Sequence, residues 1–408
     1  MRQARARPGR GARESVSGAR PWQDSGAAAD HGSNKRLDVR LFVDKTYIRA
    51  DPPLSASSRM KKLRSTGWSR STASTAFAVV CAVVVAACEV KSSTENALPR
   101  FEPLARIGSA DGRDASTLGV VADVGTDSRG RVLVLDVAKR RLAVFSPQGT
   151  LMESLGREGS GPGEFQVPVA LAVDARDRVY VLDLARGGLL VFDASGEQVR
   201  PLDDLPLRLN ATDLCTIGER LFALGARDGR LIHEISPTDG RVIRSLAADT
   251  AAADPVMAHL RSTGHLACGP GDTLTFLPSS LPEVLRFSAS SGERIGRIAI
   301  PGYRAVQITR QADGGVTFRA PEGGEVDTGS SIVTLADGRQ LIQAGPVVAG
   351  GLITEFGPVR TFVVRWDDAS ITPLPGTHPR IVSMRGDRAF TADTYPSPSV
   401  QVLRVRED

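Results

Sequence analysis

Histidine is the side chain in this sequence best suited to metal chemistry. After residue 88 the chain has four, at His233, His259, His265 and His378. Neutral imidazole binds zinc, and bound zinc activates water or polarises a carbonyl in lyases and hydrolases. Three of them, His259, His265 and His378, fall in or near predicted loops. Because none recurs at a regular repeat, we favour solvated loop histidines and expect no metal or other cofactor.

Nucleophile and phosphate-binding motifs give no support for other chemistry. No Gly-x-Ser-x-Gly elbow occurs after residue 88. The glycine-rich run at 156–163 lacks the Lys-Ser/Thr ending of a phosphate loop, and a strand rather than a helix is predicted to follow it. We interpret this run as a connection between structural repeats.

Cys88 follows a segment with the layout of an export signal. Met60 precedes Lys61, Lys62 and Arg64, and residues 76–87 are apolar but too short to span a bilayer. The segment ends Val-Ala-Ala-Cys, which resembles the lipobox of bacterial lipoproteins. That resemblance implies cleavage before Cys88, lipidation of its thiol and anchoring in a bacterial membrane, on the periplasmic or extracellular side. An ordinary signal peptide with an unmodified cysteine, or a retained short anchor, is the alternative.

The distribution of charge separates the N-terminal segment from the rest. Residues 1–87 hold 16 Lys and Arg against 6 Asp and Glu, whereas residues 88–408 hold 35 against 40. The second part would repel phosphate overall, so we expect no nucleic-acid partner. We interpret residues 1–59 as a disordered or mis-assigned upstream segment, 60–87 as the signal peptide and 88–100 as a polar tether.

An internal repeat organises residues 101–408. The segments 127–136 (DSRGRVLVLD) and 174–183 (DARDRVYVLD) align at an offset of 47 residues. Each contains alternating apolar strands and tight polar turns, which predicts a four-stranded antiparallel meander. The repeated Asp127 and Asp174 lie beside a hairpin turn, where carboxylates accept backbone N–H groups.

Weaker copies of the repeat follow. Their first turns are predicted near Gly218, Gly271, Gly338 and Gly386. We count six units, with an inserted hairpin near 303–324; a seventh unit built from 304–345 is the alternative. The last unit stops after three strands, so 101–108 is predicted to join it as the fourth strand and close a ring.

These segments carry a family resemblance. The run 156–165 (GREGSGPGEF), followed by Pro168, 171–174, 179–183 and 190–193, resembles the NHL repeat. The whole of 101–408 is similar to a six-bladed β-propeller lipoprotein of the bacterial envelope. The implied fold is all-β, with six blades of four antiparallel strands. This fold hosts binding scaffolds, lyases and lactonases alike.

Cys215 and Cys268 lie three residues before the turn glycines of neighbouring repeats. Two thiols can bridge when their Cα atoms come within about 7 Å. Because we expect the inner strands of adjacent blades to diverge, we favour buried free thiols. A disulfide is the alternative. A metal pair is disfavoured because no CxxC spacing occurs.

The loops that precede each first strand and follow each second strand share one face of such a ring. Variable loops on a rigid ring are typical recognition sites. The candidate binding residues on this face are Arg157, Glu158, Asp183, Arg186, His259, His265, Tyr303, His378, Arg380 and Tyr395.

We therefore expect a monomeric, lipid-anchored recognition or scaffolding module of the cell envelope. Its partner would be an envelope protein, a peptide or a glycan. The alternative is a metal-dependent lyase or hydrolase with zinc or calcium at the central channel, held by some of His259, His265 and His378 or by channel carboxylates.

Overall fold

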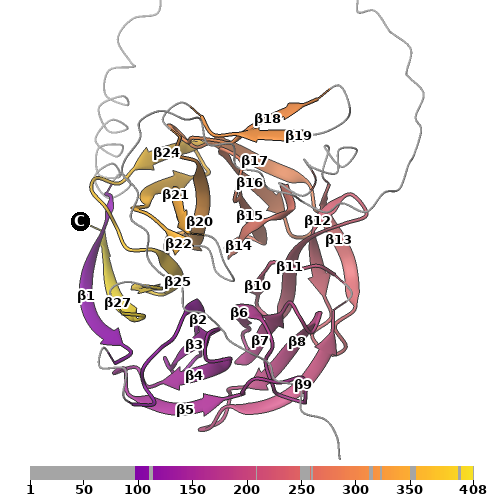
Figure 1. Ribbon diagram of the computed structural model, residues 1–408, viewed down its shortest axis with the longest axis vertical. Coiled ribbons are helices and arrows are strands. Elements are labelled where there is room, and N and C mark those ends of the chain that lie inside the picture. Colours follow the sequence, from indigo (N-terminus) through magenta and orange to yellow (C-terminus); the bar gives the residue numbers. More distant parts are fainter. Residues whose placement is uncertain are drawn as a thin grey trace, which may run out of the picture. The chain divides into compact units, whose positions relative to one another are not determined.

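Short apolar strands with frequent turns form six sheets arranged in a ring (Figure 1). The computed structural model describes residues 97–109, 114–207, 209–248, 258, 261–311, 316–321, 324–349, 355–393 and 397–407. All of them belong to one compact unit. The predicted signal segment, Cys88, His259 and Tyr395 lie outside the described residues. No helix among the described residues is long and apolar enough to cross a membrane.

The first four blades follow one another along the chain. Blade 1 contains β2 (Val121–Thr126), β3 (Val132–Asp136), β4 (Arg141–Phe145) and β5 (Leu151–Leu155). Blade 2 contains β6 (Pro168–Val173), β7 (Arg178–Asp183), β8 (Gly188–Asp193) and β9 (Arg200–Pro206). Blade 3 contains β10 (Asp213–Ile217), β11 (Arg220–Arg227), β12 (Arg230–Ile235) and β13 (Val242–Ala248). Blade 4 contains β14 (Gly264–Gly269), β15 (Thr273–Pro278), β16 (Glu283–Ser288) and β17 (Arg294–Ala299).

The last two blades depart from this simple order. Blade 5 contains β20 (Asp327–Thr334), β21 (Gln340–Ala349), β23 (Arg360–Arg365) and β24 (Ser370–Pro373), and the short β22 (Glu355–Phe356) also pairs with β21. Blade 6 contains β25 (Ile381–Arg385), β26 (Arg388–Thr391), β27 (Val400–Glu407) and β1 (Pro99–Ile107). The six-bladed, four-stranded propeller predicted from the sequence is confirmed.

Closure of the ring depends on the two ends of the described chain. β1 pairs antiparallel with β27, from Pro99 opposite Glu407 to Ile107 opposite Val400, with one irregularity between Pro103 and Ala105. The predicted closure by the N-terminal strand is therefore confirmed. It removes the edges that an open array of blades would expose.

A separate hairpin is inserted between blades 4 and 5. β18 (Gln307–Arg310) pairs only with β19 (Val316–Arg319), within the interval where the sequence predicted an insertion. The alternative of a seventh blade built from 304–345 is wrong. β20 and β21, which fall largely in that interval, are the first two strands of blade 5.

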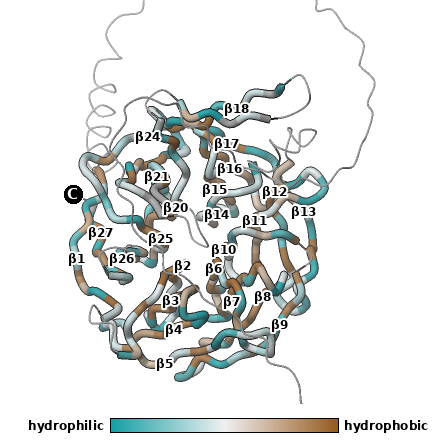
Figure 2. The backbone as a smooth tube through the Cα atoms, viewed as in Figure 1, coloured by the Kyte–Doolittle hydropathy of each residue, from teal (hydrophilic) through white to brown (hydrophobic). Residues whose placement is uncertain are grey.

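Burial is concentrated between neighbouring blades. Six apolar clusters each join side chains from two adjacent sheets, and together they follow the ring. Hydrophobic residues recur along the backbone of every blade (Figure 2). The cluster between blades 6 and 1, for example, brings Ile107 and Val402 against Val134 and Phe145. Each blade therefore depends on both neighbours for the burial of its two faces.

Carboxylates fix the hairpin turns, as predicted for Asp127 and Asp174. Oδ1 of Asp127 accepts the backbone N–H groups of Arg129 and Arg131, while its Oδ2 accepts Nε–H of Arg131 at 2.6 Å. Asp174 binds Arg176 and Arg178 in the same way. The repeated aspartates at this edge are structural.

The closing strand provides a test of this architecture. Ile107 of β1 is completely buried against blade 1, so Ile107→Ala is expected to lower the free energy of unfolding by about 2–5 kcal/mol. Leu104, on the same strand but 41% exposed, is the control, and Leu104→Ala should change it by less than about 0.5 kcal/mol. Chemical denaturation measures both. Equal effects of the two substitutions would contradict the assigned role of β1.

Candidate functional site

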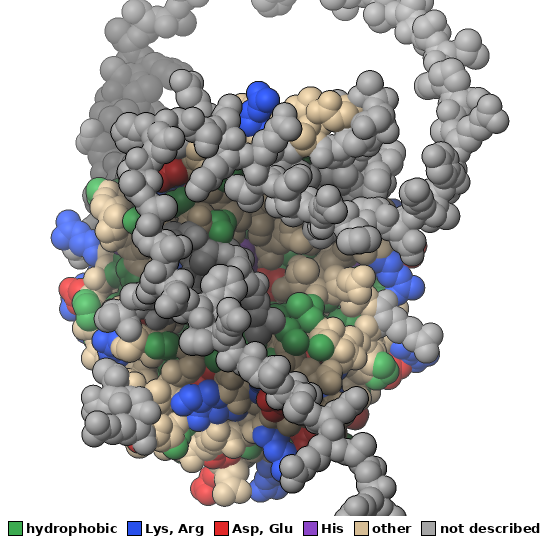
Figure 3. Space-filling model, viewed as in Figure 1, with side chains coloured by type: hydrophobic (Ala, Val, Ile, Leu, Met, Phe, Trp, Pro, Cys, Tyr) green, Lys and Arg blue, Asp and Glu red, His purple; other side chains and the backbone are tan. Residues whose placement is uncertain are grey.

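The inner strands of all six blades surround a central cavity of about 840 Å³. These strands, β2, β6, β10, β14, β20 and β25, contact one another in sequence around the ring. Close approach leaves little room for side chains in places: a Cβ at Gly125 of β2 would lie 2.5 Å from Leu171 of β6. On the face shown in Figure 3, acidic and basic side chains are scattered around the rim, without a continuous field of one sign.

Two aspartates occupy matching places on inner strands of blades 1 and 3. Asp123 of β2 accepts the backbone N–H of Val124 and that of Leu171 on β6, each at 2.8 Å. Asp213 of β10 accepts the N–H of Leu214 and that of Leu266 on β14, also at 2.8 Å. Each carboxylate thus bridges two blades and lines the cavity.

The two carboxylates share an electrostatic environment. Burial, together with the nearby negative charge of Asp213, raises the pKa of Asp123 to about 7. Its two backbone hydrogen bonds and the charge of Arg380 act in the opposite direction but are outweighed. Asp123 therefore exchanges its proton near neutral pH, which is unusual for a carboxylic acid.

Arg380 and His265 complete the ionisable groups near the aspartates. Nε of Arg380, just before β25, donates to the carbonyl of Ser330 at 3.0 Å, and burial lowers the pKa of this guanidinium. Nδ1 of His265 on β14 lies 3.7 Å from Oδ2 of Asp213. The cavity mouth therefore combines two carboxylates, one guanidinium and one imidazole from four different blades.

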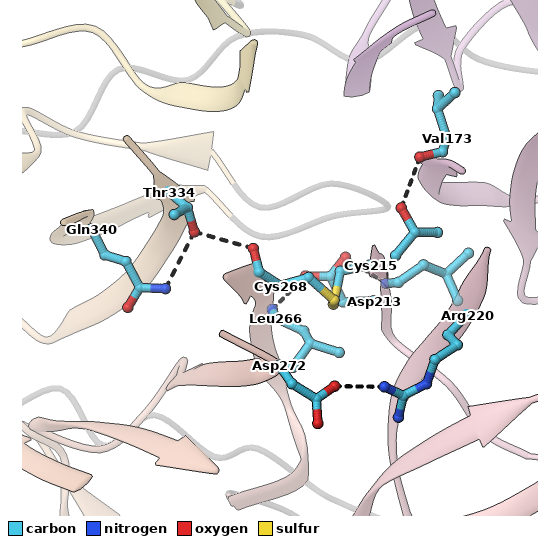
Figure 4. Close-up of a disulfide and its surroundings, with 11 residues drawn as sticks. Val173, Asp213, Cys215, Arg220, Leu266, Cys268, Asp272, Thr334 and Gln340 are labelled. Carbon is cyan, nitrogen blue, oxygen red and sulfur yellow. Dashed lines mark hydrogen bonds and ion pairs between the residues drawn. A yellow bond between two sulfur atoms is a disulfide. The ribbon is translucent and has the colours of Figure 1, made fainter. Parts of the chain in front are cut away.

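The opposite end of the channel is held by side chains bonded to neighbouring backbones. Oγ1 of Thr216 donates to the carbonyl of Val173 at 2.7 Å, and Oγ1 of Thr334 to that of Cys268 at 3.2 Å (Figure 4). Nη1 of Arg385 donates to the carbonyl of Thr126 at 2.9 Å. These bonds join blades 2 to 3, 4 to 5, and 6 to 1.

Cys215 and Cys268 form a disulfide between β10 and β14, which corrects the expectation of free thiols (Figure 4). Their Cα atoms are 5.6 Å apart. The expectation was wrong because inner strands of adjacent blades converge on the channel, while divergence increases towards the perimeter. The bridge covalently joins blades 3 and 4.

Of the predicted face residues, the structure brings His265 and Arg380 together in the cavity lining. Asp183 is buried, and its carboxylate accepts the backbone N–H groups of Gln166, Val167, Ala185 and Arg186. This carboxylate holds the connection between blades in place and is not presented on the predicted face.

Arg186 and Tyr303 also make internal contacts. Arg186 donates to the carbonyls of Gly161 and Glu164 and pairs with Asp204 at 2.6 Å. The hydroxyl of Tyr303 donates to the carbonyl of Ser279 at 2.6 Å, and burial raises the pKa of this phenol.

The remaining described residues of the predicted face, Arg157, Glu158 and His378, are not part of the cavity lining. Arg157 pairs with Glu164, and Glu158 with Arg140, both as exposed surface pairs. The imidazole of His378 packs edge-on against Phe101 of β1, the outermost strand of blade 6. His378 and His265 are therefore not brought together.

The donors required by the metal-dependent alternative do not converge in the described part of the chain. No group of three or more His, Cys, Asp or Glu side chains suited to a metal ion occurs there. Asp213 and His265 are the nearest approach to such a set, and His259 lies outside the described residues.

Sequence reasoning missed Asp123 and Asp213. A signal was present, because an aspartate interrupts an apolar inner strand at position 123, whereas the next repeat has Ala170 at the 47-residue offset. The turn aspartates, such as Asp127 and Asp174, recur at the repeat period. An aspartate that does not recur, such as Asp123, is therefore not one of them and points to another role.

Comparisons with known proteins support the fold. Residues 114–219 match the family DUF5128, described as a 6-bladed beta-propeller. A Bacteroides fragilis protein described as exported has a similar structure, with 12% identity, a TM-score of 0.51, and coverage of 78% of this chain and 96% of that one. Virginiamycin B lyase from Staphylococcus aureus gives 12% identity and a TM-score of 0.44, covering 75% and 99%. No curated protein matches the sequence. The chain is a six-bladed β-propeller.

The disulfide makes a specific prediction for a chain beginning at Ser92, whose two cysteines are Cys215 and Cys268. The bridge closes a loop of 53 residues, so reduction should lower the free energy of unfolding by up to about 4 kcal/mol. Denaturant titrations with and without reductant measure this change, and the double variant C215S/C268S should not respond to reductant. Two reactive thiols in the unreduced, denatured chain would contradict the bridge.

The raised pKa of Asp123 predicts a loss of stability on going from acid to neutral pH. The unfolded chain releases this proton near pH 3.8 but the folded chain keeps it until about pH 7, so stability falls across that interval. The fall should reach up to about 4 kcal/mol, at about 1.4 kcal/mol for each pKa unit. Relative to wild type, Asp123→Asn should gain stability progressively between pH 4 and 8 by about that amount.

Denaturation at several pH values measures this difference, and Asp387→Asn, at an exposed turn position, should follow the wild-type profile. A constant difference between wild type and Asp123→Asn across this range would disprove the assigned titration.

Proposed function

We propose that this protein is a lipid-anchored binding module of the bacterial cell envelope, and that its partner enters the central channel from the mouth that carries Asp123, Asp213, His265 and Arg380. The single observation behind this proposal is the 840 Å³ cavity with charged groups from four blades at one mouth. Ligand pockets commonly have volumes of about 300–1,000 Å³ with a few converging polar groups.

The contrast with other carboxylates supports this assignment. The carboxylates of Asp127, Asp174 and Asp183 accept backbone N–H groups inside the blades. Those of Asp127 and Asp174 also bind an arginine side chain. Asp123 and Asp213 also fix backbone groups, but they remain part of the cavity lining. Two exposed apolar side chains, Leu184 and Val347, extend the lining with surface suited to contact with a ligand.

The envelope location rests on the segment 60–88, whose basic start, short apolar core and Val-Ala-Ala-Cys ending favour export and lipidation of Cys88. A disulfide within the ring is in keeping with an oxidising compartment. We infer that the partner is a peptide or a peptide segment of an envelope protein.

Photo-crosslinking in intact bacteria tests this function with the full chain. A photoreactive residue at Leu184 or Val347 should give a defined adduct, whereas one at Ile243, which is 60% exposed on the outer strand β13, should not. The chain should fractionate with membranes, and Cys88→Ala should release it. Identical adducts from all three positions, or none at the mouth, would overturn the binding role, and membrane association unaffected by Cys88→Ala would overturn the anchor.

A further inference from the structure

The charges at the channel mouth fit one class of ligand. We propose that the mouth binds an organic cation: an ammonium or guanidinium group, on a peptide or a small molecule, pairs with the carboxylates of Asp123 and Asp213. This inference rests on the proposed function and names the ligand class for the same site.

Hydrogen bonds fix the positions of the two carboxylates before a ligand binds. Backbone N–H groups of Val124 and Leu171 fix Asp123, and those of Leu214 and Leu266 fix Asp213. Each carboxylate oxygen has two acceptor sites, and each of these four oxygens uses one for its backbone hydrogen bond. No second hydrogen bond to these oxygens comes from the described residues, so the second site can accept a donor. Little conformational entropy is lost when a donor binds side chains that are already ordered.

The charge balance at the mouth favours a cation over an anion. With both carboxylates ionised, Asp123, Asp213 and Arg380 carry one net negative charge. His265 on β14 faces Asp213, while β6 and β20 contribute no ionisable side chain to the cavity lining. Arg385 also lines the cavity, but it is exposed and bonds to Thr126, about 10 Å along β2 from Asp123, so solvent screens its charge.

In the absence of a ligand, a proton bound to Asp123 neutralises the excess negative charge at the mouth. Burial and the neighbouring Asp213 raise the pKa of Asp123 to about 7. A bound cation would favour the ionised carboxylate, so binding would release this proton. Proton release makes affinity increase with pH.

The dimensions favour an organic cation over a bare metal ion. The cavity volume of about 840 Å³ leaves space for the body of a ligand beyond its charged group. The described residues also offer no group of three metal-ligating side chains. Thr328 and Ser331 of β20 also line the cavity, but their hydroxyl groups donate to the carbonyl of Ser279 and to Oε1 of Gln343, so only their oxygen lone pairs could accept from a ligand.

The test uses a chain beginning at Ser92, because the closed ring lies entirely within residues 97–407. Aspartate carboxyl carbons are followed by 13C NMR while pH is varied, and the Asp123 signal is assigned by its loss in Asp123→Asn. Cadaverine and agmatine are the cationic probes, pentane-1,5-diol is the neutral control, and calcium chloride is the metal control. A Lys-Arg dipeptide amide distinguishes a peptide source of the cation from a free amine.

Saturating cadaverine or agmatine should lower the Asp123 midpoint by about one pH unit or more, and the diol should leave it unchanged. Calorimetry should show about 8-fold tighter binding at pH 8.5 than at pH 5.5 if the midpoint falls by one unit, approaching about 30-fold if the ligand binds the ionised form alone. Asp213→Asn should weaken binding at least tenfold, Asp387→Asn should not, and His265→Gln should retain most of the pH dependence.

The inference is overturned if the amines do not shift the Asp123 signal, if the diol shifts it equally, or if only calcium does. Calorimetry of the wild-type chain with the amines, the diol and calcium needs no variant, so a variant that fails to fold does not prevent a decision. Adducts at Leu184 and Val347 without amine binding would leave the proposed function standing and reject the cation. Amine binding without such adducts would leave the cation site standing and reject the proposed function.

Discussion

Antiparallel pairing between β1 and β27 is the constraint on which the rest of this propeller depends. The two strands come from opposite ends of the described chain, and their hydrogen bonds turn a row of blades into a ring. Every apolar cluster lies between two neighbouring sheets, so an opened ring would expose the facing surfaces of blades 6 and 1. Closure also determines the channel, because Asp123 and Arg380 belong to these two blades and face the same cavity only when the blades meet.

The same side-chain type performs two tasks in this fold, and its surroundings decide which. At the hairpin turns and blade connections, carboxylates are surrounded by backbone N–H groups and arginine side chains, which satisfy them within the blade. On the inner strands, Asp123 and Asp213 each accept two backbone hydrogen bonds from the described residues, and both line the same cavity. Because these hydrogen bonds come from uncharged backbone N–H groups and not from arginine, a ligand of opposite charge can balance the negative charge of the two carboxylates.

The fold was predictable because its determinants are local and repeated. The 47-residue offset, the alternating strands and the turn aspartates of blades 1 and 2 can be read from adjacent residues, and the truncated last repeat predicted the role of β1. The divergent later repeats were still placed by their turn glycines. Local pattern alone was therefore enough to predict six blades and an insertion.

The site was less predictable because it depends on distances across the ring. His265 and Arg380 were selected by their place on one face, but Asp123 and Asp213 are 90 residues apart in sequence and share no motif. The disulfide was missed for a related reason, since the distance between Cys215 and Cys268 follows from blade convergence near the channel. The raised pKa of Asp123 likewise arises from burial and a remote partner, which no local pattern reports.

The pairing of β1 with β27 also sets the order in which the blades can form during synthesis. β1 is the first described strand to be made, and its partner β27 is the last. Until β27 has been made, β1 has no strand to pair with, and blade 6 is incomplete. A chain that is still being made can form blades 1 to 5, but the seam between blades 6 and 1 stays open until β27 pairs with β1.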